Sequence, residues 1–366
     1  MLAFAPPSRR QKAKSRRRSG YKKRGAFSAP TEATEAISLR MNPKMRLWLP
    51  MYQQYFCRCR TIMTTSGNPA GLAPSTRDTS VHEVWLTLDG WRLRYLLCDQ
   101  AQSHQKKPPG TPVPVVLIHG LLGYSFSWRH NLGAISRCGP VYAIDLPGVG
   151  FSDRPAQLDS SFRGLAGIVA RSLDALGLET FDLIGTSHGG AVAVMLAAAV
   201  PRRVRHLVLA APANPWSTHR LWLVKLLATR PGRIAFRGMS PVLPCLNGYF
   251  LRRMYGDPRQ LTSETLAGYA APITIPGTCE HLLRMVSTWS HDLRELQPAF
   301  TRITNLPTLL IWGRRDRAVP IESAEIVKQQ FQQAELAVIE GAGHLPYEEV
   351  PEVFNRVVCE FLEAGN

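Results

Sequence analysis

Residues 181–199 read FDLIGTSHGGAVAVMLAAA and join an apolar run to a run of small residues through the pattern G-x-S-x-G. The apolar run 181–184 predicts a strand covered on both faces, and residues 191–199 predict a buried helix. A serine in such a sharp strand-to-helix turn has its hydroxyl pushed outward, and glycines two residues before and after it let strand and helix approach. We therefore predict that Ser187 is a nucleophile; a glycine-rich turn with an incidental serine is the alternative.

Further apolar runs without alternation lie on both sides of this stretch. They are residues 113–118, 141–144, 204–209 and 306–312, and helical patterns such as 165–176 separate them. Runs of this kind are typical of parallel strands that helices cover on both faces. Residues 81–88 and 91–97 instead alternate around Asp89-Gly90, which predicts a β-hairpin. The expected fold class is α/β, with a mostly parallel sheet flanked by helices.

The spacing of these runs divides the chain into four segments. We expect a basic tail and linker in residues 1–80, a core in two parts, 81–212 and 303–366, and a helical insertion in 213–302. About 90 residues separate the strand ending near Ala211 from the strand starting near Leu306, whereas a simple crossover needs only about a dozen. The gap has helical periodicity, so we interpret it as a separate helical subdomain.

The basic excess is a property of the N-terminus. The formal net charge is +17. Residues 1–60 hold 15 Lys and Arg against two acids, a net charge of +13, which leaves +4 for residues 61–366. The first 30 residues are rich in Arg, Lys, Ser and Pro, and we expect them to be disordered because they bury little apolar surface.

Several interpretations of the tail stay open. It could contact an anionic surface such as a membrane, and its Arg/Ser-rich, acid-poor composition resembles an organelle transit peptide. It lacks interleaved aromatic residues, so we predict no specific nucleic-acid partner. The translated start could also lie upstream of the true one, at Met41, Met45, Met51 or Met63.

The seven cysteines predict reduced thiols. Their number is odd and the chain is long, which disfavours a disulfide scaffold and favours a reducing, cytoplasmic location. No C-x-x-C pair occurs, and Cys57 and Cys59 are too closely spaced for a zinc site without other ligands. No run of 18 apolar residues occurs, so we expect no transmembrane helix.

Three other loops follow predicted strands and carry chemically useful groups. HGLLG (119–123) follows VPVVLI, GRRD (313–316) follows LPTLLIW, and GAGH (341–344) follows AELAVIE. Open α/β sheets build their sites at the carboxyl ends of strands. We predict His344 as the general base, Asp316 as the acid that orients it, and the backbone N–H groups of Leu121 and His188 as the oxyanion hole.

Four side chains that compete for these roles are interpreted as structural. We expect His119 to anchor its loop. The His188 side chain neighbours the serine and should point elsewhere, which excludes it as the base. Asp182 and Asp292 are the competing acids, but Asp182 precedes the elbow and Asp292 falls in the insertion. Asp316 instead follows a predicted strand and lies between Ser187 and His344, the order of α/β-hydrolase triads.

Five blocks of the chain, taken in order, resemble the α/β-hydrolase superfamily. They are IHGLLGYSFSW (118–128), DLPGVGFSD (145–153), GTSHGG (185–190), GRRDRAVP (313–320) and GAGHLPYEEVPE (341–352). The resemblance covers about residues 81–364 and is to the capped esterase, lipase and carbon–carbon-bond hydrolase group. It implies an eight-stranded sheet, a cap domain in the insertion, and a triad of Ser187, Asp316 and His344. Asp145 and Pro147-Gly148 match a loop that shapes the site floor in the family, without a catalytic role.

Two departures narrow the resemblance. Epoxide hydrolases and haloalkane dehalogenases resemble this layout but carry aspartate at the elbow, where this chain has Ser187. Hydrolases of ring-cleavage products usually have an aromatic residue after the histidine, where this chain has Leu345. The first difference argues against both aspartate-dependent activities, and the second weakens a carbon–carbon-bond assignment.

The expected activity is hydrolysis of a carboxylic ester through an acyl-enzyme, with no metal or organic cofactor. The segment RLWLVKLL (220–227) favours a small to medium, apolar substrate. Alternatively, its Trp and Leu side chains pack within the insertion. A carbon–carbon-bond hydrolase and a non-catalytic ligand-binding homologue remain the alternatives. The oligomeric state cannot be deduced from these patterns.

Overall fold

A computed structural model describes residues 81–99, 112–217, 226–238 and 243–364. The expectations for the basic tail, the linker and the alternative starts lie outside these residues. Most of the segment RLWLVKLL does as well.

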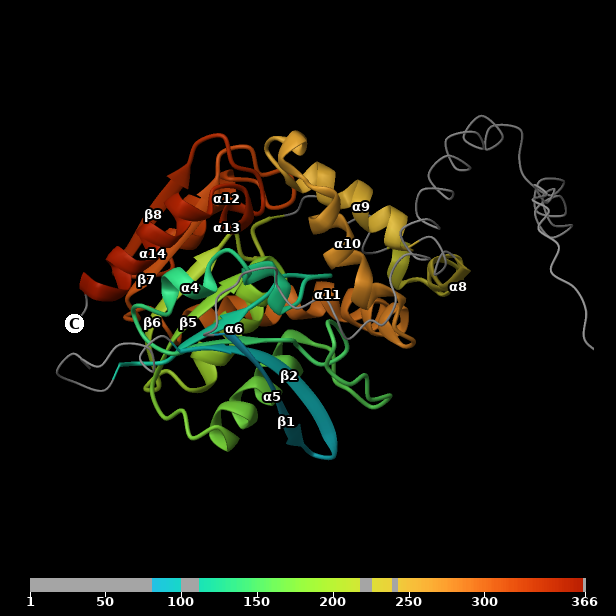
Figure 1. The fold of residues 1–366 in the computed structure, drawn as a ribbon, viewed down its shortest axis with the longest axis horizontal. Coiled ribbons are helices and arrows are strands. Elements are labelled where there is room, and N and C mark those ends of the chain that lie inside the picture. The colour runs from blue at the N-terminus through green and yellow to red at the C-terminus, as the bar shows by residue number, and fades with distance from the viewer. Residues whose placement is uncertain (1–80, 100–111, 218–225, 239–242, 365–366) are drawn as a thin grey trace, which may run out of the picture. The chain divides into compact units, whose positions relative to one another are not determined.

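An eight-stranded sheet forms the centre of the described residues (Figure 1). Its strands are β1 (Val81–Leu88), β2 (Trp91–Cys98), β3 (Val115–Ile118), β4 (Val141–Ile144), β5 (Phe181–Thr186), β6 (Val204–Ala210), β7 (Thr308–Gly313) and β8 (Ala334–Ile339). They lie in the order β1-β2-β4-β3-β5-β6-β7-β8. Strand β2 is antiparallel to β1 and β4, and every other pair is parallel. The predicted α/β fold with a mostly parallel sheet is confirmed.

Helices connect the strands along the chain. The described helices are α4 (Leu132–Ile135), α5 (Phe162–Ala175), α6 (Ser187–Ala199), α8 (Arg230–Gly238), α9 (Leu243–Met254), α10 (Ser263–Ala270), α11 (Thr278–Phe300), α12 (Glu322–Lys328), α13 (Pro346–Glu349) and α14 (Pro351–Ala364). Short 3-10 helices occur at η3 (Ser125–Trp128), η5 (Pro258–Gln260) and η6 (Ala271–Thr274). None of these described helices is both long and apolar enough to cross a membrane.

Local sequence chemistry sets where the first strands begin and turn. Asp89 and Gly90 have φ values of 53° and 80°, the conformation that a two-residue turn between twisted strands requires. The predicted hairpin of β1 and β2 is therefore confirmed. Strands β3 and β7 begin two residues later than the apolar runs suggest, after Pro114 and Pro307, because proline has no N–H to give to the ladder.

The two faces of the sheet carry separate layers of core side chains. In β3, Val116 and Ile118 belong to the cluster that includes the apolar residues of α5 and α6. Val115 and Leu117 belong to the cluster that includes α4 and α14. Because successive strand residues point to opposite faces, a continuous apolar run means that both faces are covered.

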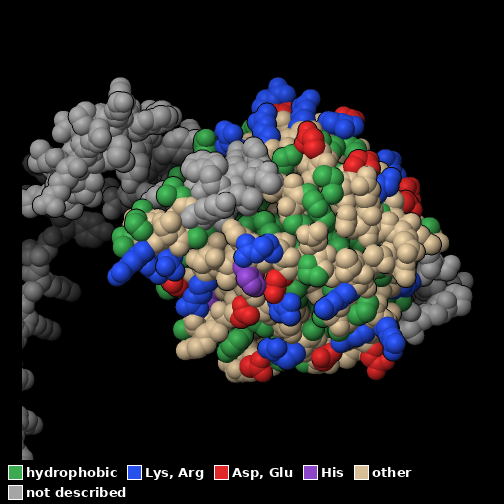
Figure 2. All heavy atoms as spheres, turned by 180° about the vertical axis from the view of Figure 1, so that it is seen from behind, with side chains coloured by type: hydrophobic (Ala, Val, Ile, Leu, Met, Phe, Trp, Pro, Cys, Tyr) green, Lys and Arg blue, Asp and Glu red, His purple; other side chains and the backbone are tan. Residues whose placement is uncertain are grey.

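Charged side chains of both signs are interspersed over the face that Figure 2 shows. Exposed or partly exposed ion pairs among the described residues include Arg203 with Asp174 at 2.6 Å and Arg314 with Glu340 at 3.0 Å. Exposed pairs of this kind contribute little to stability.

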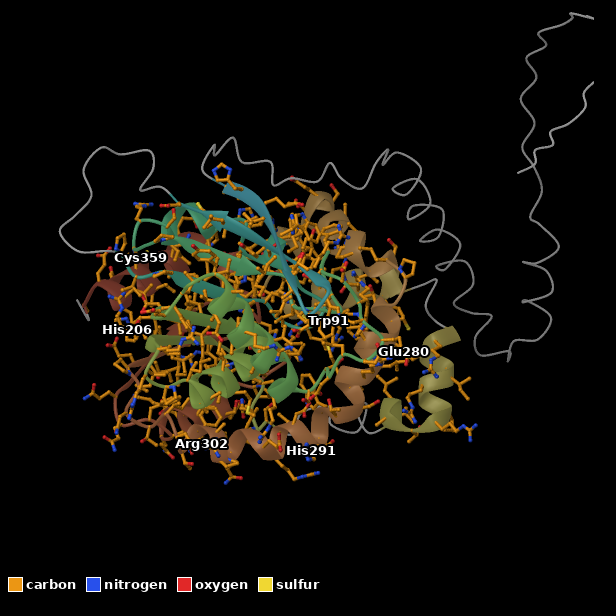
Figure 3. All side chains as sticks on the ribbon, turned by 90° about the horizontal axis from the view of Figure 1, so that it is seen from below. Trp91, His206, Glu280, His291, Arg302 and Cys359 are labelled. Atoms are coloured by element: carbon orange, nitrogen blue, oxygen red, sulfur yellow. The ribbon has the colours of Figure 1, made fainter. Side chains whose placement is uncertain are left out.

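Helices α8 to α11 fill the chain between β6 and β7, where the helical insertion is expected. Arg237 of α8 pairs with Glu280 of α11 at 2.9 Å, and Figure 3 shows Glu280 beside α8. The other end of α11 reaches the sheet, since Leu296 and Phe300 are fully buried in the same core cluster as α5 and α6. Helix α11 thus joins the insertion to the body of the domain.

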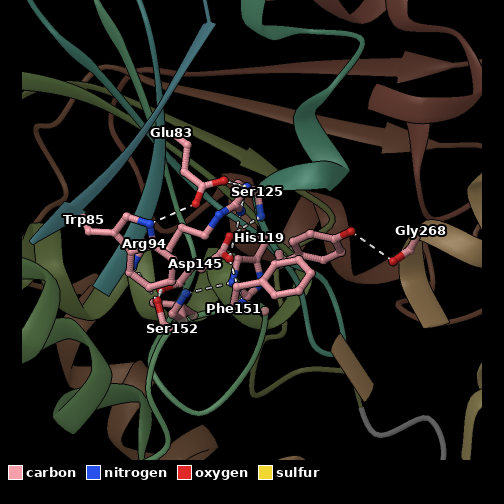
Figure 4. A network of polar contacts seen from close by, with 12 residues as sticks. Glu83, Trp85, Arg94, His119, Ser125, Asp145, Phe151, Ser152 and Gly268 are labelled. Atoms are coloured by element: carbon pink, nitrogen blue, oxygen red, sulfur yellow. Dashed lines mark hydrogen bonds and ion pairs between the residues drawn. The ribbon is translucent and has the colours of Figure 1, made fainter. Parts of the chain in front are cut away.

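A buried carboxylate holds the loop after β4 in place (Figure 4). Asp145 accepts hydrogen bonds from the backbone N–H groups of Ser125 at 2.7 Å and Phe151 at 2.9 Å, and from the Arg94 guanidinium at 3.2 Å. A Cβ at Gly150 would lie 2.6 Å from the Asp145 carboxylate, so the turn passes too close for a larger residue. These contacts give Asp145 a structural role in holding this loop.

Replacing Asp145 with asparagine should lower the free energy of unfolding by about 3 kcal/mol or more, because it leaves the buried Arg94 charge under-compensated. Urea denaturation measures the change. Asp153→Asn is the matched control: this carboxylate is 38% exposed and pairs with Arg92, so its loss should cost about 1 kcal/mol or less. Equal losses in the two variants would contradict the role given to Asp145.

Candidate active site

Ser187 lies in a strained turn at the start of α6. Its φ is +51°, which non-glycine residues rarely adopt. A Cβ at Gly185 would lie 2.6 Å from the Gly189 carbonyl oxygen, and a Cβ at Gly189 would lie 2.2 Å from the His119 carbonyl oxygen. The helix begins at the serine itself and not at Ala191. Gly185 allows the strand to approach the helix closely, and Gly189 allows the helix to approach the loop after β3.

Asp316 and His344 meet at the carboxyl ends of β7 and β8. His344 Nδ1 lies 2.7 Å from Asp316 Oδ2. The other oxygen of Asp316 accepts the N–H groups of Ala318 at 2.7 Å and Val319 at 2.9 Å. Both side chains are buried. The carboxylate is therefore held by backbone donors and keeps one oxygen for the imidazole.

The His344–Asp316 contact leaves His344 Nε2 as the ring atom available to take a proton. Among the described residues, Ser187 and His344 make no hydrogen bond to each other. Such contacts often tighten only when substrate binds, and the role of Ser187 as nucleophile stays a prediction.

The segments that carry the two expected oxyanion donors lie next to Ser187. The Gly123 N–H donates to the Gly120 carbonyl at 3.0 Å and closes a turn whose central residues include Leu121. A Cβ at Gly120 would lie 3.3 Å from the Ser187 Cβ. The His188 N–H is in the first turn of α6, where helices have no internal acceptor. The placement is compatible with an oxyanion hole.

His119 connects two loops near the site. Its Nε2 accepts the Leu146 N–H at 3.0 Å, so the proton is on Nδ1, which donates to the Gly120 carbonyl at 2.8 Å. Burial lowers the pKa of His119, which keeps the ring neutral. These contacts fit the anchoring role expected from the sequence.

A model of the alpha/beta hydrolase family matches residues 115–357, which is more than half of the chain. The chain belongs to this family. It is 31% identical over 265 residues to the 2-hydroxy-6-oxo-2,4-heptadienoate hydrolase of Pseudomonas putida, covering 70% of this chain and 91% of the relative. It is 32% identical over 260 residues to a 2-hydroxymuconate semialdehyde hydrolase of Pseudomonas putida, covering 69% and 88%.

Solved structures of the same fold are more distant in sequence. The Cif epoxide hydrolase from Acinetobacter nosocomialis superposes with a TM-score of 0.68 at 17% identity, covering 86% of this chain and 96% of that chain. The likeness extends to the fold alone. The fold alone does not identify the chemistry of this alpha/beta hydrolase, which depends on its own residues.

The side chain of His188 points into an aromatic cluster and not at the serine. Its ring stacks on Trp289 of α11 at 5.9 Å between centroids and meets the edge of Phe162 at 5.2 Å. Its Nε2 has no hydrogen-bond partner among the described residues. Burial, with a smaller effect of His119, lowers its pKa to about 3. A ring that stays neutral and faces away from Ser187 does not serve as the base.

The buried ring predicts a specific dependence of stability on pH. The unfolded chain binds a proton on His188 below its ordinary pKa of 6.5, whereas the folded chain binds it only near pH 3. Stability from this group is therefore complete above pH 6.5 and falls as the pH drops toward 3. Between pH 8 and pH 5 the loss should be about 2 kcal/mol. His188→Phe should abolish that part of the slope in urea denaturation, whereas His291→Gln, at an exposed position, should keep it.

The two competing acids lie away from His344. Asp182 pairs with Arg205 at 2.5 Å and with His206 at 3.0 Å at the amino-terminal end of β5, opposite to Ser187. Asp292 is buried in α11, and burial raises its pKa to about 6. No group of three or more potential metal ligands occurs within the described ranges.

The insertion touches the loops of this alpha/beta hydrolase's site, through residues that sequence reasoning did not single out. Tyr124, in the loop after β3, donates to the Gly268 carbonyl of α10 at 2.9 Å. Glu348, four residues after His344, accepts the Tyr255 hydroxyl at 2.6 Å, is also bonded by Tyr269, and pairs with Arg129 at 3.2 Å. Two adjacent glutamates in a sequence are typical of a solvent-exposed surface. No sequence pattern therefore indicated that Glu348 and Glu349 are buried.

Proposed function

We propose that this alpha/beta hydrolase is a serine hydrolase that cleaves carboxylic esters through an acyl-enzyme on Ser187. The observation that supports the proposal most directly is the His344–Asp316 hydrogen bond of 2.7 Å, formed between loops that end neighbouring strands. A carboxylate held by two backbone N–H groups can fix the imidazole tautomer and stabilise the imidazolium that forms when the ring takes a proton.

The proposed steps use the groups already described. His344 Nε2 takes the Ser187 hydroxyl proton while the oxygen attacks the ester carbonyl, and the N–H groups of Leu121 and His188 bind the oxyanion. The imidazolium then gives its proton to the leaving alcohol. Water, activated by the same ring, attacks the acyl-enzyme and releases the acid and Ser187. The insertion, which contacts the loops after β3 and β8, would act as the cap that covers the acyl chain.

A carbon–carbon-bond hydrolase is the second candidate, and the Pseudomonas putida relatives favour it. Their names describe hydrolysis of 2-hydroxy-6-oxo-dienoate compounds and a related semialdehyde. The position after the histidine favours the ester instead, because Leu345 replaces the aromatic residue usual in that group. Ser187 at the elbow disfavours epoxide hydrolysis, which uses an aspartate there.

A substrate panel separates the two candidates. Purified protein is assayed with p-nitrophenyl esters from acetate to dodecanoate and, in parallel, with a 2-hydroxy-6-oxo-dienoate. Ester turnover that exceeds dienoate turnover in kcat/KM, and that disappears in Ser187→Ala, is the expected result. Preference for the dienoate would replace the ester proposal with the second candidate. No turnover of either, with no labelling by a fluorophosphonate, would leave a non-catalytic homologue.

A further inference from the structure

One carboxylate holds the backbone on both sides of the proposed base. Glu349 Oε1 accepts the N–H of Gly343 at 2.9 Å and the N–H of Leu345 at 3.3 Å. The N–H between them, that of His344, donates to the Met254 carbonyl at 2.7 Å. Three consecutive amides around the histidine are therefore bound, and none of their acceptors belongs to the histidine loop itself.

The same carboxylate reaches into the insertion. Glu349 Oε2 accepts the Gly256 N–H at 2.6 Å. The two backbones are in direct contact, since a Cβ at Gly256 would lie 2.2 Å from the Gly341 carbonyl oxygen. A Cβ at Gly343 would likewise lie 2.2 Å from the Met254 carbonyl oxygen. Residues 254–256 and the histidine loop therefore pack as one unit.

Glu349 is costly to bury, and its partners are unusual for a buried acid. Glu349 is 8% exposed. Burial raises the pKa of its carboxyl group, and hydrogen bonds from backbone N–H groups partly offset that rise. Among the described residues no Lys, Arg or His pairs with it. A buried carboxylate that binds only backbone amides fixes the path of a chain segment, because each amide has one direction.

We propose that Glu349 is a positioning residue for the catalytic base. It holds the His344 loop against residues 254–256 of the insertion and thereby keeps the His344–Asp316 contact in place. The proposal rests on the proposed function in that it takes His344 as the base. Rotation of the loop by a small angle would lengthen the His344–Asp316 hydrogen bond, and misplacement of a catalytic group by about 1 Å can cost about 100-fold in rate.

The neighbouring acid supplies a matched control. Glu348 is as buried as Glu349 and also joins the insertion to the core, but it binds the side chains of Tyr255, Tyr269 and Arg129 and no amide of the histidine loop. Glu348→Gln should destabilise the fold at least as much as Glu349→Gln, because it leaves the buried Arg129 without its carboxylate. A loss of kcat that came only from destabilisation would therefore appear in both variants. A positioning effect should appear only in Glu349→Gln.

The experiment compares both variants in the full chain. Glu349→Gln keeps the shape but turns one acceptor oxygen into an NH2 group, so either the Gly256 amide or the amides of both Gly343 and Leu345 lose their acceptor. We expect kcat for the best ester to fall between about 10-fold and about 100-fold, with KM changed less than about threefold. The downfield proton resonance of His344 Nδ1–H should shift in Glu349→Gln and stay in place in Glu348→Gln, which should also keep kcat within about threefold.

The outcomes that oppose the proposal are distinct. A folded Glu349→Gln variant with unchanged kcat and an unchanged His344 resonance would overturn it, as would equal kcat losses in the two variants. If Glu349→Gln does not fold, Glu349→Asp repeats the test, because the shorter side chain cannot reach both Gly343 and Gly256. A wild-type protein that neither turns over esters nor labels at Ser187 would contradict the proposed function, and the His344 resonance would still test the positioning role.

Discussion

Replacing Ser187 with alanine should lower kcat for the best ester by about a million-fold, to the level that binding and the oxyanion donors supply alone. The loss is large because the acyl-enzyme cannot form without the hydroxyl, and no other described serine shares the elbow geometry. KM should change little, since alanine leaves the proposed oxyanion donors and the insertion in place. The residual rate is measured in single-turnover assays on variant purified apart from wild type.

Covalent labelling gives an independent readout of the same residue. Wild-type protein should react with a fluorophosphonate, and Ser187→Ala should not. Ser172→Ala is the control, because this serine is buried in α5 and donates only to the Val169 carbonyl, so its labelling should equal that of wild type. Undiminished labelling of Ser187→Ala would remove the nucleophile from the proposal.

Replacing Asp316 with asparagine should lower kcat by about 10⁴-fold. Asparagine keeps the size of the side chain, but its NH2 group cannot accept the His344 Nδ1 proton if it faces the ring. The imidazole then adopts the wrong tautomer and the imidazolium loses its partner. Because the residues act as one unit, a double variant with His344→Ala should be about as slow as the slower single variant. Stopped-flow and steady-state assays measure these rates.

Asp292→Asn is the control for the acid, since Asp292 is equally inaccessible to solvent but lies in α11. It should keep near-normal turnover. Near-normal turnover in Asp316→Asn, together with loss in Asp292→Asn or Asp182→Asn, would place the acid elsewhere.

The fold was largely predictable because its strands are covered on both faces. Runs such as 115–118 and 141–144 are apolar at every position, a pattern that solvent-exposed segments do not show. The catalytic candidates could be predicted for a related reason: Ser187, Asp316 and His344 each stand in the turn or loop after a predicted strand. Parallel strands end at the same edge of a sheet, so loops far apart in sequence meet there. Asp316 and His344 lie 2.7 Å apart in this arrangement, and their catalytic roles stay a prediction.

The supporting contacts could not be predicted, because they depend on which distant segments come together. Glu348 and Glu349 end the short helix α13, just before α14, where acidic residues are usually solvated. Nothing in GAGHLPYEEVPE distinguishes a buried glutamate from an exposed one. Arg94 lies in an alternating strand and reads as a solvent-facing residue, yet it is 5% exposed and pairs with Asp145. Burial of a charge is decided by its partners, which local patterns do not contain.

The close approach of Gly256 to the histidine loop sets a boundary for protein engineering. A chimera that takes its whole insertion, 213–302, from another hydrolase would also import a foreign backbone at 254–256. Any residue larger than glycine at position 256 would displace Gly341 and Gly343, and with them the proposed base His344. Exchangeable modules therefore lie on either side of 254–256, and these three residues should be inherited from the recipient protein together with its histidine loop.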